Sequence, residues 1–159
     1  MTAIARQRKA TKANPHPDTL PLVPTERRQV TLKTAFHFTC TCSRCMAGQS
    51  SDLRLEEIDR LQQTLNDWNE DSTGSPKKAE KLIQLYRKEG LEGFLDIAYG
   101  YAALAYNAVG DAAKANKFAK LAAEALTFKE GPNGRDMEMW RELTASPKHH
   151  WSWRWRKRT

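Results

Sequence analysis

Apolar side chains recur at steps of three and four residues between residues 52 and 130, and this period restricts the fold more than any other feature. The clearest stripe consists of Leu55, Ile58, Leu61, Leu65 and Trp68. Such spacing places the apolar groups along one face of an α-helix. No stretch longer than Phe36–Thr41 alternates as a half-buried strand does. The pattern therefore predicts a mainly α fold.

Capping residues and glycines divide this region into separate helices. Ser75 and Pro76 are typical of a helix start, Gly90 of a helix end, and Gly110–Asp111 of a turn. We expect helices over 52–68, 76–89, 91–109 and 111–128, followed by a short helix over 136–143 and irregular chain from Ala145.

Two interpretations of the aromatic side chains in this array stay open. Tyr106, Gly110, Ala115 and Ala122 are spaced as in one tetratricopeptide-type helix hairpin. A peptide-binding groove lined by Tyr101, Tyr106 and Phe118 is the functional interpretation. The structural one is that these rings form the core, as helical stripes usually do.

Charge is concentrated at the two ends of a 159-residue chain whose net charge is +7. Residues 1–35 hold seven basic and two acidic side chains, and residues 148–159 hold five basic and no acidic ones. No apolar run is long enough to cross a bilayer, so we expect no membrane span. The basic start lacks the apolar stretch of a secretory signal, which predicts a nuclear or cytoplasmic location.

The three cysteines of the chain, Cys40, Cys42 and Cys45, lie within six residues. An odd number of clustered thiols without a secretory signal indicates a metal site rather than a disulfide framework. We expect Thr25 to cap a helix that Glu26 opens and that leads into the cysteines, and residues 48–51 to connect it to the next helix.

Zinc prefers four tetrahedral ligands, and three sulfurs leave one position open. His37 is the nearest candidate in the sequence, while His16, His149 and His150 are more distant. Arg44, Lys33 and the amides of the turn would stabilise the thiolates by lowering their pKa. Three reduced thiols without metal are the alternative.

The residues around the cysteines resemble a known family. Arg27-Arg28-Gln29, Leu32-Lys33 and the string from Phe36 to Cys45 are similar to the post-SET segment of SET-domain protein lysine methyltransferases, of the SET-and-MYND type in particular. In that family a helical, tetratricopeptide-like domain follows, as residues 52–130 do here. The specific part of the resemblance covers about residues 25–46.

The resemblance implies zinc bound by Cys40, Cys42 and Cys45, with a fourth cysteine from the SET core. It also implies that Phe38 packs against the adenine of S-adenosylmethionine when a full SET core is present. The 159 residues contain no such core, no catalytic tyrosine before the helix and no MYND zinc finger. We therefore expect no catalytic residue and no activity of the chain alone.

The run His149–Arg158 alternates tryptophan and basic residues. Its side chains could stack on bases and contact phosphates, which would make the chain a nucleic-acid binder. Alternatively Trp151, Trp153 and Trp155 pack one face of an extended tail onto the helices, with Ser152, Arg154 and Arg156 outward.

These observations predict a tetratricopeptide-like helical array preceded by a short cysteine-rich, post-SET-like loop. Its parts are a disordered basic and proline-rich lead (1–24), a helix with the cysteine cluster (25–48), a helical domain (52–130), and a short helix with a basic aromatic tail (131–159). The expected function is that of a C-terminal methyltransferase fragment acting through a protein or peptide partner. A peptide-binding adaptor and a nucleic-acid binder are the alternatives.

Overall fold

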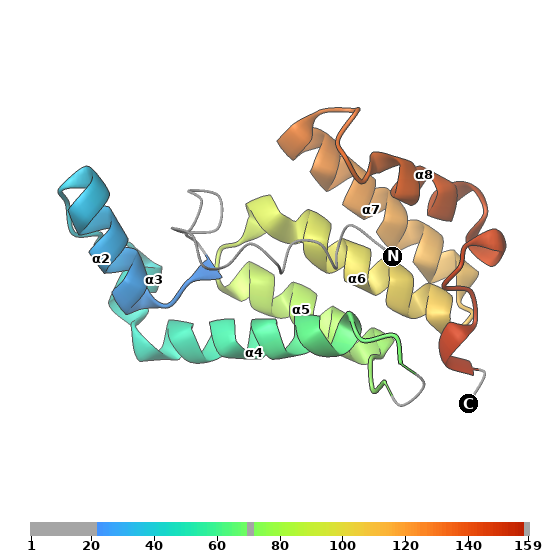
Figure 1. Cartoon of the computed structure of the whole chain (residues 1–159), viewed down its shortest axis with the longest axis horizontal. Helices are drawn as coiled ribbons and strands as arrows, with labels where there is room; N and C mark the ends of the chain where they lie inside the picture. Colours follow the sequence, from blue (N-terminus) through green and yellow to red (C-terminus); the bar gives the residue numbers. More distant parts are fainter. Residues whose placement is uncertain (1–21, 70–71, 158–159) are drawn as a thin grey trace. The chain divides into compact units, whose positions relative to one another are not determined.

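The computed structural model describes residues 22–69 and 72–157 (Figure 1). Most of the predicted lead over 1–24 lies outside them. The described residues form seven α-helices and no strand, which confirms the mainly α prediction. None of these helices is both long enough and apolar enough to cross a membrane. The chain divides into two compact units, the first ending at Arg60 and the second beginning at Leu61.

The first unit contains α2 (Thr25–Phe36), α3 (Ser43–Ala47) and the first part of α4 (Gln49–Leu65). A polar contact joins two of these helices, because the backbone N–H and the hydroxyl of Thr25 both donate to Asp52 Oδ1, at 2.7 and 2.9 Å. The prediction that Thr25 caps the helix was therefore wrong. Pro24 holds the N-cap position, and the Thr25 side chain is engaged across the unit.

Two further boundaries in this unit differ from the prediction. The first helix ends at Phe36, and His37 takes a left-handed conformation (φ 57°), so the helix does not run directly into the cysteines. Only Gly48 separates α3 from α4, so the predicted connector over 48–51 is wrong beyond its first residue. Gly48 has φ 48°, which few other residues adopt at low cost.

The second unit contains α5 (Pro76–Lys88), α6 (Leu95–Ala108), α7 (Ala112–Glu130) and α8 (Met137–Ala145). The cap predicted at Ser75 is confirmed, since its Oγ accepts from the Lys78 amide at 3.4 Å. Asp111, which was predicted in a turn, caps α7 by accepting from the Lys114 amide at 3.0 Å. The predicted helix over 91–109 begins later than expected. Residues Glu92–Phe94 (η2) form a 3₁₀ turn, and α6 starts at Leu95.

Small side chains allow α6 to lie centrally in this unit, beside α7 (Figure 1). The side chains from Gly100 to Ala108 are all buried, and α7 turns Ala115, Ala119 and Ala122 inward. Helices with such residues at their contact approach closely, because little side-chain volume separates them. Gly100 also makes room for Trp140 of α8, whose ring would lie 2.7 Å from a Cβ added at residue 100.

The aromatic stripe contributes to the core of this unit. Tyr106 is buried, which confirms its interpretation as core, and Tyr101 is buried as well, whereas Phe118 is only half-buried. Tyr106 stacks on Phe118 with ring centroids 5.5 Å apart, and its hydroxyl donates to Glu80. The tetratricopeptide-like arrangement remains a prediction.

The tail packs onto the second unit in a different way from the one predicted. It is not extended: Pro147–His149 (η3) and Trp155–Lys157 (η4) are 3₁₀ turns, and Arg154 has φ 53°. Ser152, which was expected outside, is fully buried between His150 Nδ1 at 2.8 Å and Asn107 Nδ2 at 2.9 Å. Trp151 and Trp155, expected inside, are more than two-fifths exposed. The turns abolish the period-two alternation on which the prediction depended.

Arg156 anchors the end of the tail. Its Nη2 donates to the carbonyls of Asp67 at 2.9 Å and Leu65 at 3.3 Å, and its guanidinium lies 4.4 Å from the centroid of the Trp68 ring. The Trp155 indole N–H donates to the Trp68 carbonyl at 3.0 Å. Arg156 and the Trp155 indole N–H are thus engaged within the protein, which leaves fewer tail groups for the predicted nucleic-acid contacts.

Candidate metal centre

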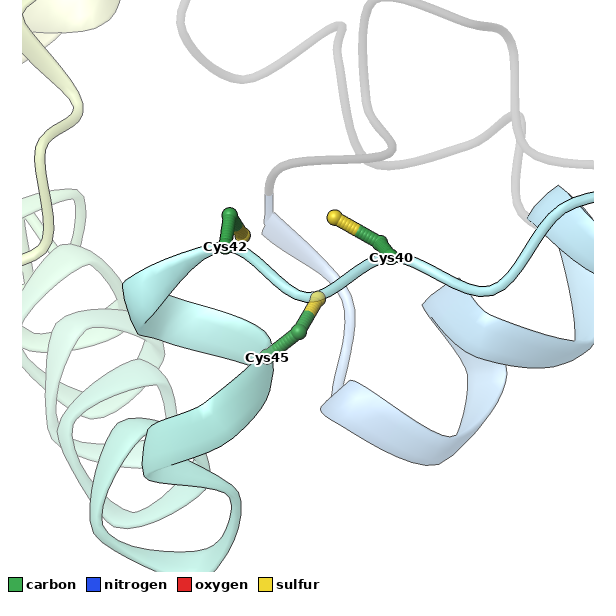
Figure 2. A group of neighbouring side chains, drawn as sticks. All are labelled: Cys40, Cys42 and Cys45. Atoms are coloured by element: carbon green, nitrogen blue, oxygen red, sulfur yellow. The ribbon is translucent and has the colours of Figure 1, made fainter.

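The three cysteines come from three different local structures. Cys40 lies within the non-helical segment between α2 and α3, Cys42 is the N-cap of α3, and Cys45 lies in the first turn of α3. The Met46 amide donates to the Cys42 carbonyl at 2.9 Å, which closes the turn that carries Cys45. Figure 2 shows the three side chains gathered around the entry into this helix.

The sulfur positions fit a tetrahedral metal. One ligand atom from each of Cys40, Cys42 and Cys45 lies within 4.8 Å of the other two. Zinc–thiolate bonds of about 2.3 Å at tetrahedral angles require sulfurs about 3.8 Å apart, so the cluster needs only a modest contraction. All three thiols are free of disulfides, and Cys42 is exposed while the other two are half-buried. The donor set consists of soft sulfur atoms, which suits zinc.

Two side chains of α2, Gln29 and Arg28, contact the cysteines. Gln29 binds both backbone groups of Cys40: its Nε2 donates to the Cys40 carbonyl at 2.6 Å, and its Oε1 accepts from the Cys40 amide at 3.0 Å. Arg28 is buried and donates to the Val23 carbonyl at 2.8 Å and to the Thr25 hydroxyl at 3.0 Å. Its Nη2 also lies 4.0 Å from Cys45 Sγ.

The two cysteines of α3 differ in acidity. The backbone amide of Cys45, with a further contribution from Cys40, lowers the pKa of Cys42 to about 7. Desolvation raises the pKa of Cys45, and Arg28 partly opposes this. The expectation that the amides of the turn stabilise a thiolate is therefore confirmed at Cys42.

The other residues singled out in the sequence lie around the cluster rather than in it. His37 is exposed, and no histidine of the described segments joins the group of three sulfurs. Phe38 is half exposed, and Lys33 is exposed on α2. The Arg28 guanidinium reaches a sulfur, that of Cys45. Sequence reasoning missed this role and that of Gln29, although both belong to the string that carries the family resemblance.

Exposed apolar side chains are concentrated near the cysteines. Among the described residues, five of the eight large apolar side chains that are exposed belong to this part of the first unit: Val30, Phe36, Phe38, Met46 and Leu53. α2 has no buried apolar face, because Val30, Ala35 and Phe36 are exposed and Leu32 is half-buried. Exposed apolar side chains mark an interaction site where they gather into one patch.

The fold and the site together define a helical protein with a three-cysteine candidate metal centre. Comparisons with protein-family models, curated proteins and solved structures gave no match.

We predict that replacing Arg28 by methionine weakens zinc binding by about 10- to 100-fold, as the loss of an outer partner of a metal ligand typically does. Methionine keeps much of the apolar stem but removes the guanidinium beside Cys45 and the donor to Val23. Competition with a chromophoric chelator measures the affinity. The control is Arg27→Met, which removes an exposed guanidinium from the same turn. Equal affinities of the two variants would contradict the role assigned to Arg28.

Proposed function

We propose that this chain is the post-SET and helical C-terminal portion of a SET-type protein lysine methyltransferase. Its own chemistry is to hold one zinc ion through Cys40, Cys42 and Cys45, with the fourth position filled from outside the cluster. The observation that carries the proposal is the convergence of three sulfurs within 4.8 Å at a place where no fourth described side chain joins them. A metal at this site would be structural, since it would join the segment after α2 to α3.

Zinc is preferred over other thiophilic metals for a reason of coordination. Three sulfurs within 4.8 Å of one another suit a single tetrahedral ion, whereas the cysteines of an iron–sulfur cluster bind different irons and lie farther apart. Copper(I) also favours thiolates, so it is the competing occupant. Zinc can complete its tetrahedron with water in the isolated chain and with a protein ligand in an assembled enzyme.

The proposal assigns no methyl transfer to the chain alone. Methyl transfer requires the donor methyl group and the lysine amine to be held in line, and positioning supplies most of the rate. Phe38 is the single residue for which the resemblance implies contact with S-adenosylmethionine, and its ring is half exposed. A chain that carries this segment would act by covering one side of a catalytic core.

Protein interaction is the remaining role in the proposal. Five exposed apolar side chains lie within residues 30–53, the segment that carries the cysteines, as expected of a surface that another module covers. The helical second unit would then be the tetratricopeptide-like domain of the family, with a role in contacting protein partners.

X-ray absorption at the zinc edge tests the coordination directly. The reduced chain loaded with zinc should show three sulfur neighbours at about 2.3 Å and one lighter neighbour. Two or fewer sulfurs would contradict the proposed ligand set. An assay with S-adenosylmethionine and protein substrates tests the second part. Methylation of lysine by the purified chain alone would contradict the assignment of a non-catalytic portion.

A further inference from the structure

The three disulfides that Cys40, Cys42 and Cys45 could form are not equally favourable. Cys42 and Cys45 lie in one helical turn, closed by the hydrogen bond from the Met46 amide to the Cys42 carbonyl. Residues three apart in a helix have Cα atoms about 5 Å apart, inside the range of about 4.4–6.8 Å that a disulfide accepts, and their Cβ atoms need to approach from about 5–6 Å to about 4.5 Å. Their sulfurs already lie within 4.8 Å. This pair can therefore approach bonding distance by side-chain rotation and a small tightening of one turn.

Pairs that involve Cys40 are less favourable. Cys40 and Cys42 are separated by one residue, so a disulfide between them would close a smaller and more strained ring than a disulfide between Cys42 and Cys45, which are separated by two residues. Both backbone groups of Cys40 are also bound by Gln29 of α2. Drawing Cys40 toward Cys45 would strain or break these two hydrogen bonds.

Exposure decides which thiol meets an oxidant first. Cys42 is the exposed member of the cluster, whereas Cys40 and Cys45 are half-buried. A small peroxide in solvent thus reaches Cys42, and Cys45 is the neighbour placed in the same turn to react next.

We propose that Cys42 and Cys45 form a reversible disulfide that excludes zinc from the cluster, a redox control that rests on the proposed zinc function. The oxidant class is a peroxide. The Cys42 thiolate attacks one oxygen of hydrogen peroxide, so that an S–O bond forms, the O–O bond breaks and hydroxide leaves. The Cys45 sulfur then attacks the Cys42 sulfur, so that the S–S bond forms and the S–O bond breaks, and the proton of the Cys45 thiol passes to the departing hydroxide. The two sulfurs lose two electrons in total, and the oxygen leaves as hydroxide, which takes up a proton to give water.

The disulfide removes two of the three zinc ligands. Cys40 alone cannot hold the ion, because zinc sites in proteins use three or four protein ligands. A dithiol reductant reverses the step by exchange and restores the site. Metal binding and oxidation are thus alternative states of one cluster.

Tryptic peptides of the full chain reveal the pairing. Cleavage after Lys33, Arg44 and Arg54 places Cys40 and Cys42 in one peptide and Cys45 in the next. The reduced, zinc-free chain is treated with hydrogen peroxide, alkylated and digested under non-reducing conditions. A cross-link between the two peptides is expected in the wild type and in Cys40→Ser, and it should be lost in Cys42→Ser.

Several outcomes would overturn the proposal. They are loss of the cross-link in Cys40→Ser, a disulfide within the first peptide, a disulfide between two chains, or sulfinic acid as the main product. Zinc content gives the second readout: the wild type should fall from one zinc per chain to none after peroxide and recover with dithiothreitol. Equal zinc content of oxidised and reduced chain would refute the exclusion.

The two proposals fail in different ways. If the reduced chain binds no zinc, the proposed metal function is wrong, while the peptide map still decides the pairing. If the reduced chain binds zinc but no Cys42–Cys45 cross-link forms, the redox control alone is wrong.

Discussion

Replacing Cys45 by serine should weaken zinc binding by roughly a hundredfold or more. Structural zinc sites bind with apparent free energies of about 10–16 kcal/mol spread over four ligands, so one thiolate accounts for about 2.5–4 kcal/mol. The loss should be severe here because the cluster has three sulfurs and no fourth described side chain to compensate. Titration against a competing chelator gives the affinity.

Metal binding should also order the first unit. Its apolar side chains are largely exposed, and polar contacts such as those of Gln29 and Asp52 connect its helices. We expect zinc to slow amide exchange in α2 and α3 of the wild type and to have little effect in Cys45→Ser. The matched control is Met46→Ser, which alters the neighbouring side chain, 73% exposed, and leaves the sulfur ligands in place. Retention of wild-type zinc affinity by Cys45→Ser would show that the cluster is not the site.

Replacing Trp140 by alanine should destabilise the second unit by about 3–5 kcal/mol, the usual cost of removing a buried tryptophan. Trp140 is 4% exposed, and its ring lies directly over Gly100 of α6. The loss is large compared with the 5–15 kcal/mol that typically stabilises a domain. Urea unfolding followed by circular dichroism measures it, and Phe128→Ala, which changes a side chain 95% exposed, should shift stability by less than about 0.5 kcal/mol.

Because residues 100 and 140 lie against each other, the effect of Gly100→Ala on stability should change sign when the Trp140 ring is removed. Gly100→Ala alone should destabilise the protein, because overpacking costs about 1–3 kcal/mol and the better helix propensity of alanine returns about 1 kcal/mol. In the Trp140→Ala background the obstructing ring is gone, so Gly100→Ala should stabilise. Additive effects of the two substitutions would show that residues 100 and 140 do not share the same space.

The sequence predicts those features that depend on neighbours along the chain. The stripe through Leu55, Ile58, Leu61 and Leu65 is buried as expected, and Ser75 caps the helix that follows it. Thr25 was misassigned because its partner, Asp52, lies 27 residues away. Local pattern indicates that a threonine can cap a helix, but it does not reveal a competing acceptor elsewhere in the fold.

The candidate site likewise has residues that the sequence predicts and residues whose roles depend on the fold. Cys40, Cys42 and Cys45 could be grouped from the sequence because their spacing alone keeps the thiols close. The roles of Arg28 and Gln29 could not be assigned from the sequence. They depend on the left-handed turn at His37, after which the cysteine segment comes back alongside α2. The tail was mispredicted because Arg154 and the 3₁₀ turns reverse a chain that the alternation suggested was straight.

The contact of Arg156 with the carbonyls of Leu65 and Asp67 brings the entry and the exit of the second unit together. A module whose two ends meet can be inserted into a surface loop of an unrelated host without stretching that loop. It also suits circular permutation, in which a short linker joins the original ends and new ends are made elsewhere. The turn at Gly131–Gly134, between α7 and α8, is a suitable place for such new ends.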